Sequence, residues 1–478
     1  MIAARSQFGS LLGWCMLVII GQQLSATWLV ERYQITSGSM APTLLGVHCH
    51  LKCSACNREY DIGLDQPPRY GQPAYCPECG AKGPLVEDQT VLAGDQVYLD
   101  RSAFLWRDPQ RWEVVAFRSP QRSAEVHVKR VVGLPGETVE IRHGDLYING
   151  KIPERTLEQI CAMSILVHDA TNSQAGETDH GPRWKLKEAV SGWEQSSPDE
   201  WRYLIDKLPP SVDFMELFRS APGEFALDEK LKWAKERTTP DIFERIKTDW
   251  LVFENRKRVP HPSQEAVPSS IDDNFGYNQT VQISQASEVT DVRVSMKMLG
   301  GSKQNVVTLN LPVEFSKMEQ IDVTPEGNPW AILCGVVVRP TYFQRVIDWA
   351  KRRLPQDSRG NKHAIEIVTF DKLGICFVDG IQTSDSKPVA TIPSPRPISF
   401  ESWWGCTTSI SDLRVYRDIY FTSPVGLRGA LAIDEPFTLG PDEFFVLGDN
   451  SELAVDSRYP LYGPVRAKLL VGKLIGVK

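Results

Sequence analysis

Two serines and one lysine are the residues of this chain whose types and setting favour nucleophilic catalysis. Ser37 and Ser39 flank Gly38 in the stretch SGSMAPTL, and a glycine permits a tight turn or the close approach of another segment. Lys129 stands among valines in the strand-like run VHVKRVV. A lysine drawn into apolar surroundings loses its charge more readily, so its pKa falls from about 10.4 toward about 8. Such an amine can take the proton of a serine hydroxyl, which is the chemistry of a Ser-Lys nucleophile.

Each of these features also has an ordinary interpretation. A Ser/Gly stretch is often a linker, and a lysine on a strand often extends its ammonium group to water. Only their combination with other blocks of the chain favours catalysis over these alternatives.

Two CxxC pairs form a second group with chemical potential. CSAC and CPEC are separated by 19 residues, which is the spacing of a four-thiolate zinc site with ligands Cys53, Cys56, Cys76 and Cys79. The unit around them is too small to bury much core, so a bound metal would largely fold it. Disulfide bonds are the alternative outside the cytoplasm, where thiols oxidise. Cys49, between His48 and His50, is an additional candidate ligand.

Length and composition bound the class of protein. The 478 residues suffice for two to four domains. The net charge of −7 argues against nucleic acid as the main partner, because phosphate binding needs a basic surface. The eight histidines include no HExxH pattern. The four cysteines that follow Cys79 lack metal-ligand spacing, and we predict that they are buried thiols: Cys161, Cys334, Cys376 and Cys406.

The N-terminal segment predicts a membrane anchor. Residues 8–30 contain no charge over 23 positions, enough for a helix to cross a bilayer core of about 30 Å. Arg5 favours an inside N-terminus, with the chain after Arg32 on the outer face. A cleaved signal peptide ending at Ala26 is the alternative, for which the bulky Leu24 makes a poor cleavage site.

The rest of the chain is mostly β-like. Between about residues 88 and 153, runs such as DQVYLD and EVVAFR alternate apolar and polar residues, and His143-Gly144 favours a hairpin turn. Residues 154–430 contain many short strand-like runs, which favour a β-sandwich, and one helix-like stretch at 229–250. Its clustered tryptophans Trp184, Trp193 and Trp201 are more typical of a core than of a sugar-binding platform.

Three blocks, in order along the chain, resemble type I signal peptidases. They are SGSMAPTL, then DQVYLDRSAFLWRDPQRWEVVAFRSP leading into VKRVVGLPGETVEI, and finally FVLGDNSELAVDSRYPLYGPV. The resemblance implies that Ser39 is the nucleophile, Lys129 the general base and Ser37 an oxyanion-hole donor beside the N–H of Ser39. It also implies supporting roles in the third block, with an ion pair between Asp456 and Arg458, for Asp449, Asn450, Asp456, Ser457 and Arg458. The family usually has a serine where this chain has Ala454, so Lys129 would take a hydroxyl partner such as Ser457 or work without one.

The resemblance implies a mainly β fold with a discontinuous peptidase core. We expect an anchor at 8–30, core segments at 31–47, 88–153 and 431–478, a zinc-ribbon insertion at 48–87, and a sandwich insertion with some helix at 154–430. The sandwich resembles concanavalin or laminin-G folds, which often bind glycans, although a fold alone does not establish a ligand. The ribbon would serve as a structural staple near the cleft entrance.

The implied function is a membrane-anchored serine endopeptidase that removes signal peptides from exported preproteins. It would need no catalytic cofactor, contain structural zinc, contact the lipid bilayer, and work on the outer, periplasmic side of the cytoplasmic (inner) membrane as a single-pass protein. The alternative is a catalytically impaired scaffold that acts as an envelope binding protein through its ribbon and lectin-like sandwich.

Overall fold

The structure is a computed structural model that describes most of the chain after the apolar N-terminal segment. The described residues are 29–122, 124–172, 183–186, 192–197, 199–203, 249–257, 267–268, 270, 271–280, 286–299, 306–311, 313–315, 331–334, 362–370, 373–382, 387–391, 397–402, 408–424 and 427–477. The predicted anchor at 8–30 and the predicted helix at 229–250 lie outside them except for two residues each. Within the described ranges, no helix has the length and apolar character needed to cross a bilayer.

A seven-stranded antiparallel sheet is built from segments far apart in the sequence. Its strand order is β1 (Val30–Gln34), β6 (Gln96–Asp100), β31 (Leu470–Val477), β7 (Val114–Arg118), β8 (Val126–Gly133), β29 (Glu443–Leu447) and β30 (Val465–Arg466). β31 therefore joins the pair β1–β6 to the pair β7–β8. The alternating runs predicted as strands form β6, β7 and β8, because one face of each packs against apolar side chains such as Leu99, Phe117 and Val131.

A smaller antiparallel sheet packs beside the first. It contains β10 (Asp145–Ile148), β9 (Thr138–Arg142) and β28 (Phe437–Thr438). The turn predicted at His143-Gly144 does join β9 to β10, and both of its residues have positive φ. The core between the two sheets includes Val139, Leu439 and Phe445.

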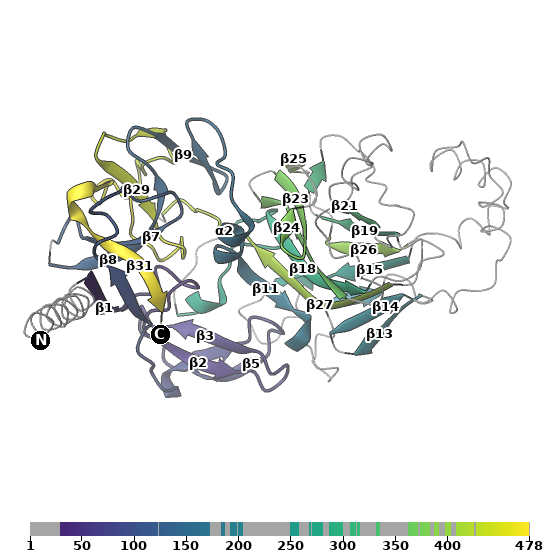
Figure 1. The fold of residues 1–478 in the computed structure, drawn as a ribbon. Helices are drawn as coiled ribbons and strands as arrows, with labels where there is room; N and C mark the ends of the chain where they lie inside the picture. Colours follow the sequence, from purple (N-terminus) through teal and green to yellow (C-terminus); the bar gives the residue numbers. More distant parts are fainter. Residues whose placement is uncertain are drawn as a thin grey trace, which may run out of the picture.

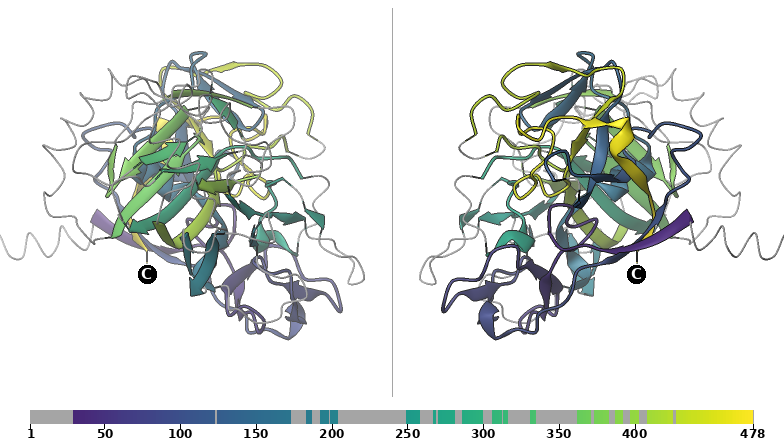
Figure 2. Two further views of the ribbon diagram at one scale, coloured as in Figure 1. Left: turned by 90° about the vertical axis from the view of Figure 1, so that its right-hand side faces the viewer. Right: turned by 90° about the vertical axis from the view of Figure 1, so that its left-hand side faces the viewer.

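Two short hairpins form the cysteine-rich unit, which we call the ribbon (residues 48–87). One pairs β2 (His48–Lys52) with β3 (Glu59–Gly63), and the other pairs β4 (Pro73–Tyr75) with β5 (Lys82–Leu85). In all three views of Figures 1 and 2 the ribbon lies below the larger sheets.

The large insertion folds as two stacked sheets. The strand order of the larger sheet is β13 (Trp193–Ser197), β14 (Glu200–Tyr203), β27 (Thr408–Arg417), β18 (Val292–Leu299), β22 (Lys362–Val368), β23 (Leu373–Val378), β25 (Lys387–Thr391) and β20 (Val313–Phe315). In addition, β11 (Ile165–Asp169) pairs with β27, and β24 (Ile381–Gln382) pairs with β23. The smaller contains β12 (Trp184–Leu186), β15 (Asp249–Phe253), β26 (Ser399–Ser402), β19 (Val306–Asn310) and β21 (Ala331–Cys334). The insertion also contains a separate two-stranded pair, β16 (Arg256–Lys257) with β17 (Val267–Pro268), and the short helix α2 (Leu157–Ala162).

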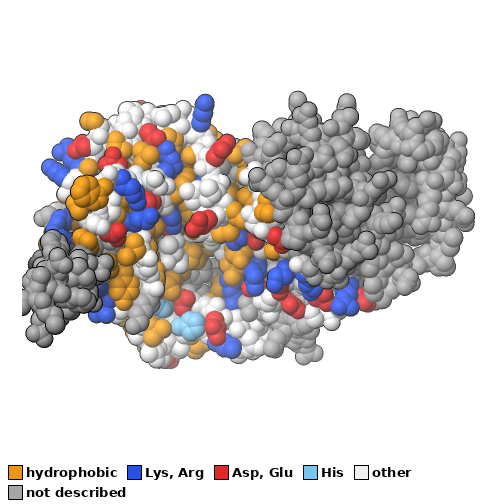
Figure 3. Space-filling view, in the orientation of Figure 1, with side chains coloured by type: hydrophobic (Ala, Val, Ile, Leu, Met, Phe, Trp, Pro, Cys, Tyr) orange, Lys and Arg blue, Asp and Glu red, His pale blue; other side chains and the backbone are white. Residues whose placement is uncertain are grey.

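One apolar cluster fills the space between these two sheets. It includes Phe253 and Phe400 from the smaller sheet and Val294 and Ile410 from the larger. The outer face of the larger sheet is charged instead, with paired ions such as Lys297 and Asp412, and Figure 3 shows basic and acidic side chains interleaved there. Apolar side chains between two sheets and charged side chains outside them are typical of a β-sandwich. The likeness of this insertion to lectin folds stays a prediction.

The predicted core positions in the sandwich hold for the tryptophans and not for every cysteine. Trp184, Trp193 and Trp201 are buried, as predicted, and so offer no exposed face for stacking on a sugar. Cys161 was predicted to be buried, and this is wrong. It lies near the C-terminal end of the short helix α2, where its sulfur accepts a hydrogen bond from Arg293 at 3.3 Å. Cys376 is half-buried, and Cys406 lies outside the described residues.

Candidate active site

Ser39 and Lys129 lie in direct contact, although they come from different parts of the seven-stranded sheet. Ser39 is in the turn that follows β1, and Lys129 is the fourth residue of β8. The Nζ of Lys129 donates a hydrogen bond to the Oγ of Ser39 over 2.6 Å. Both side chains are buried, with exposed fractions of 4% for Lys129 and 8% for Ser39.

Burial makes the amine of Lys129 unusually easy to deprotonate. Removal from water lowers the pKa of Lys129 to about 8, although the negative charges of Asp456 and Asp449 act in the opposite direction. The neutral amine is therefore a substantial fraction near pH 8. An uncharged amine in contact with a serine hydroxyl can act as a general base toward it.

The hydroxyl of Ser37 is close to the same point. Its Oγ lies 3.2 Å from the Oγ of Ser39, and Ser37 itself is exposed while Ser39 is not. A hydroxyl in this place can donate to an oxygen that develops beside the nucleophile.

Asp449 and Asn450 fix the turn that carries Ser39. The carboxylate of Asp449 accepts from Arg130 Nε at 2.8 Å and from Thr43 at 2.5 Å. Asn450 binds two successive backbone carbonyls of this turn: its backbone N–H donates to the carbonyl of Ser39 at 3.1 Å, and its Nδ2 donates to the carbonyl of Gly38 at 3.0 Å.

Asp456 and Arg458 form a fully buried ion pair with Nε to Oδ1 at 2.8 Å. Arg458 also donates to the carbonyl of Thr422 at 2.6 Å, which secures the end of the insertion to the third block. Asp456 accepts from the N–H of Gly448 at 3.0 Å, one residue before Asp449. The pair thus holds the Gly448–Asn450 loop against the nucleophile turn.

The suggestion that Ser457 supplies a hydroxyl partner for Lys129 is wrong. The Ser457 hydroxyl accepts the N–H of Val446 at 3.0 Å instead. Ala454 is buried beside Gly448 and has no polar side-chain atom. Among the described residues, the only hydrogen bond of Lys129 Nζ goes to Ser39.

Several residues of the site were not identified from the sequence. Arg130 was overlooked although it directly follows Lys129, and alternation along a strand places it on the opposite face, toward Asp449. Asp65 of the ribbon accepts the N–H of Gly38 at 2.7 Å, the Tyr277 ring of the large insertion lies close to Gly38, and Asn278 of the same insertion pairs with Asn450. No local pattern marks these last three, because each belongs to an irregular segment of an insertion.

The four CxxC sulfurs converge in the ribbon. All four Sγ atoms of Cys53, Cys56, Cys76 and Cys79 lie within 4.8 Å of one another. The contacts Cys53–Cys79 and Cys56–Cys76 measure 3.5 and 3.6 Å, far longer than the ~2 Å of a disulfide. Four thiolates around one zinc ion at about 2.3 Å would stand about 3.8 Å apart, so this donor set fits zinc.

Cys49 and its neighbours lie outside this group. Cys49 is buried in the apolar core of the ribbon, and His48 Nδ1 lies 2.8 Å from the carbonyl oxygen of Gly46. His50 pairs with Asp61 at 2.8 Å. Cys49, His48 and His50 therefore make contacts of their own away from the four clustered sulfurs.

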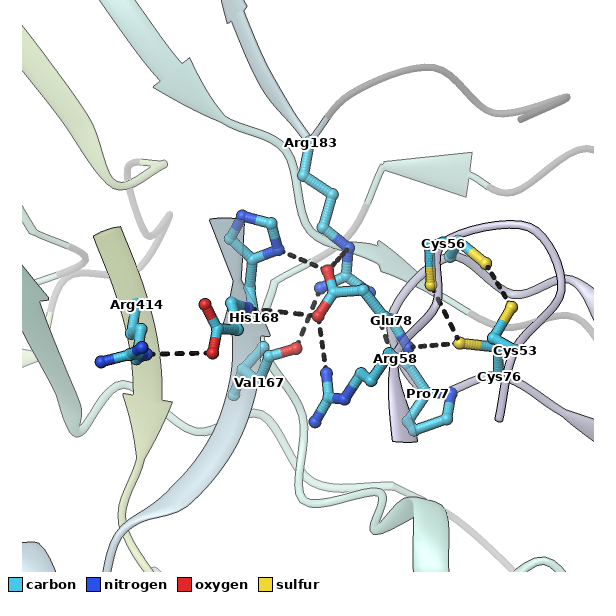
Figure 4. Close-up of polar contacts among 12 residues, drawn as sticks. Cys53, Cys56, Arg58, Cys76, Pro77, Glu78, Val167, His168, Arg183 and Arg414 are labelled. Atoms are coloured by element: carbon cyan, nitrogen blue, oxygen red, sulfur yellow. Dashed lines mark hydrogen bonds and ion pairs between the residues drawn. The ribbon is translucent and has the colours of Figure 1, made fainter. Parts of the chain in front are cut away.

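A buried glutamate joins the ribbon to the sandwich. Glu78, between the two cysteines of CPEC, contacts Arg58 at 2.6 Å within the ribbon and His168 of β11 in the sandwich (Figure 4). The N–H of Asp169 donates to it at 3.2 Å, and Arg183 approaches at 3.6 Å. Burial alone would raise the pKa of Glu78, but the positive charges of His168, Arg183 and Arg58 hold it below its usual range. The ribbon and the sandwich thus share one ionised group.

Comparison with known proteins supports the resemblance to type I signal peptidases. A family model described as "Signal peptidase, peptidase S26" matches residues 8–180, which include Ser39 and Lys129 and exclude the third block. A signal peptidase I of Pseudomonas aeruginosa is 32% identical over 127 residues, 26% of this chain and 32% of that protein. A probable signal peptidase I-2 of Synechocystis is 30% identical over 70 residues, 14% of this chain and 32% of that protein.

A solved signal peptidase I from Enterococcus faecalis is 47% identical over 10% of this chain and 41% of that chain, with a TM-score of 0.10. The chain spans about a third of the length of the two curated relatives named above.

Proposed function

We propose that this chain is a serine endopeptidase of the signal peptidase I type, which removes N-terminal signal peptides from exported preproteins. The observation that carries the proposal is the 2.6 Å hydrogen bond from the buried Lys129 to Ser39. The similarity of residues 8–180 to peptidase family S26 supports the same reaction class. In this proposal Ser39 is the nucleophile and Lys129 the general base.

The reaction proceeds in two acyl-transfer steps. The neutral Nζ of Lys129 takes the Ser39 proton while Oγ attacks the scissile carbonyl carbon. The Ser39 N–H and the Ser37 hydroxyl receive the developing oxyanion, a type of contact whose loss typically costs about 10²–10³ in rate. As the C–N bond breaks, Lys129 returns the proton to the leaving amine. Water, deprotonated by the same amine, then attacks the acyl carbon, and Lys129 returns this proton to Oγ of Ser39 as the ester bond breaks.

The substrate would bind as an extended strand with small residues at the first and third positions before the cut. The first half of β8 pairs with β7 on one side, through Val126–Arg118 to Lys129–Val115. On its other side, β29 pairs only with residues from Arg130 onward, and no described strand pairs with residues 126–129 there. An unpaired edge that leads to the base is suited to strand addition by a peptide.

We further propose that residues 8–30 are retained as an anchor in the cytoplasmic membrane, with the catalytic core on the outer face. The uncharged length of the segment supports this arrangement. The ribbon would hold one structural zinc ion on Cys53, Cys56, Cys76 and Cys79, whose converging sulfurs support a four-thiolate site. Zinc takes no part in the proposed chemistry.

A preprotein-cleavage assay tests the proposal. The full chain in detergent or vesicles should cleave a preprotein at its signal-peptide junction, whereas Ser39→Ala and Lys129→Ala should each lose the activity almost completely. Lys151→Ala, at an exposed lysine of the same core, serves as the matched control and should cleave like the parent. A parent that cleaves nothing, or two site variants as active as the parent, would instead favour a non-catalytic binding protein.

A further inference from the structure

A short piece of the large insertion reaches into the proposed peptidase site. This piece, residues 275–280, which we call the wedge, includes the 3-10 turn Gly276–Asn278. It lies between the ribbon, the turn that carries Ser39 and the loop after β29. Its ribbon side is secured by Thr280, whose hydroxyl donates to the carbonyl of Gly63 at 2.8 Å, and by Gln279, whose Nε2 donates to that of Tyr75 at 2.8 Å.

Tyr277 packs directly behind the nucleophile turn. Its side chain is only 3% exposed, and its hydroxyl accepts the N–H of Gly46 at 3.2 Å. A Cβ atom added to Gly38 would lie 2.3 Å from the Tyr277 ring, and one added to Gly63 would lie 2.1 Å from it. The glycine between the two serines is therefore required by the close approach of this ring.

Asn278 is paired with a residue that holds the nucleophile turn. The side-chain amides of Asn278 and Asn450 exchange two hydrogen bonds of 2.8 Å, and both residues are buried. The Nδ2 of Asn278 also donates to the carboxylate of Glu452 at 2.9 Å, which fixes the direction of the Asn278 amide. The pairing of Asn450 with Asn278 then sets which way the Nδ2 of Asn450 points, which is toward the carbonyl of Gly38 at 3.0 Å.

The planar peptide bond links the hydrogen bond at the Gly38 carbonyl to the direction of the Ser39 N–H. The Gly38 carbonyl and the Ser39 N–H belong to one planar peptide, in which a trans bond makes them point in opposite directions. A donor that holds the carbonyl therefore fixes the direction of the N–H. That N–H is the donor that the proposed function assigns to the oxyanion.

We propose that Asn278 is a positioning residue for the oxyanion hole, acting through Asn450 and the Gly38–Ser39 peptide, with Tyr277 as the support behind that peptide. This inference rests on the proposed peptidase function. It makes the large insertion part of the active site, since a residue about 240 positions away from Ser39 in sequence orients a catalytic donor.

The test compares cleavage kinetics of wedge variants in the full chain. Asn278→Ala should lower kcat by about 10- to 100-fold with little change in KM, because a misaligned oxyanion donor weakens only transition-state binding. Thr280→Val, in the same wedge, loses a hydrogen bond to the ribbon alone and should keep kcat within about twofold of the parent. Melting temperatures of both variants show whether their loss of stability is comparable.

A double-variant cycle separates positioning from general support. If Asn278 acts through Asn450, kcat of the double variant Asn278→Ala/Asn450→Ala should match that of Asn450→Ala alone. Asn278→Asp keeps the acceptor for Asn450 and loses the donor, so it should also lower kcat; it takes the place of Asn278→Ala if that variant does not fold.

Parent-like kcat in the Asn278 variants, an equal kcat loss in Thr280→Val, or multiplicative losses in the cycle would overturn the inference while leaving the peptidase function intact. A parent no more active than Ser39→Ala would overturn both.

Discussion

The Nζ of Lys129 lies 2.6 Å from the Oγ of Ser39, although 90 positions separate the two residues along the chain. The contact is buried, and the pKa of Lys129 is lowered to about 8. Asp456, Asp449 and Asp65 favour the charged amine, whereas burial and Arg458 oppose it. The balance leaves the amine ready to accept a proton in mildly alkaline solution.

The pH dependence of cleavage should report this group. Because only the neutral amine can act as the base, kcat/KM should rise with pH, reach half of its maximum near pH 8 and level off above it. The measurement is a pH–rate profile of the parent on one preprotein. A rate that is already at its maximum at pH 6 would contradict the assignment of Lys129 as the base.

Asp65 should tune that profile from the ribbon. Asp65→Asn retains an acceptor for the Gly38 N–H but removes a negative charge near Lys129, so the midpoint should move to lower pH with kcat nearly retained. Asp65→Ala removes the acceptor as well, and it should also lower kcat. Profiles of the two variants that cannot be told apart from the parent would show that the ribbon has no effect on the dyad.

Lys129 should limit the stability of the fold. Its pKa in the folded chain, about 8, is below the ordinary lysine value of 10.5 that applies in the unfolded chain. Between these values the unfolded chain binds more protons, so the contribution of this group to stability rises with pH from about 8 to about 10.5 and is unfavourable at pH 7.

Replacing the buried amine should therefore stabilise the protein while it abolishes activity. Lys129→Met should raise the free energy of unfolding at pH 7 by up to about 3 kcal/mol, the equivalent of the pKa difference, less the lost hydrogen bond to Ser39. Urea unfolding at pH 7 measures it, with Lys151→Met as the exposed control. A variant less stable than the parent at this pH would show that burial of the charged amine does not destabilise the fold.

The ribbon should contain one zinc ion for each chain. Protein purified under reducing conditions should release zinc with a chelator, and Cys53→Ala should lower its zinc content. Cys49→Ala is the matched control, since Cys49 is equally buried in the ribbon but lies outside the sulfur group. Protein without zinc, with the four cysteines found in disulfides, would contradict the metal site.

Sequence reasoning brought Ser39 and Lys129 together because both stand in blocks of a known family, and alternation located β6, β7 and β8. It did not find Asp65 or Asn278, since such contacts are made by polar residues in irregular segments and leave no periodic trace. Glu78 was missed for a different reason. A glutamate within a knuckle would ordinarily face water, and only the arrangement of Arg58, His168 and Arg183 around it makes its burial tolerable.

The position of β31 also determines when the two halves of the sheet can be joined during synthesis. Ser39 follows the β1 side of the sheet and Lys129 is on the β8 side, and β31 is the strand that unites the two halves. Until the ribosome has made residues 470–477, each half has a free edge where its partner belongs. A nascent chain that lacks β31 therefore has both residues of the proposed dyad but not the strand that joins the two halves of the sheet from which they come.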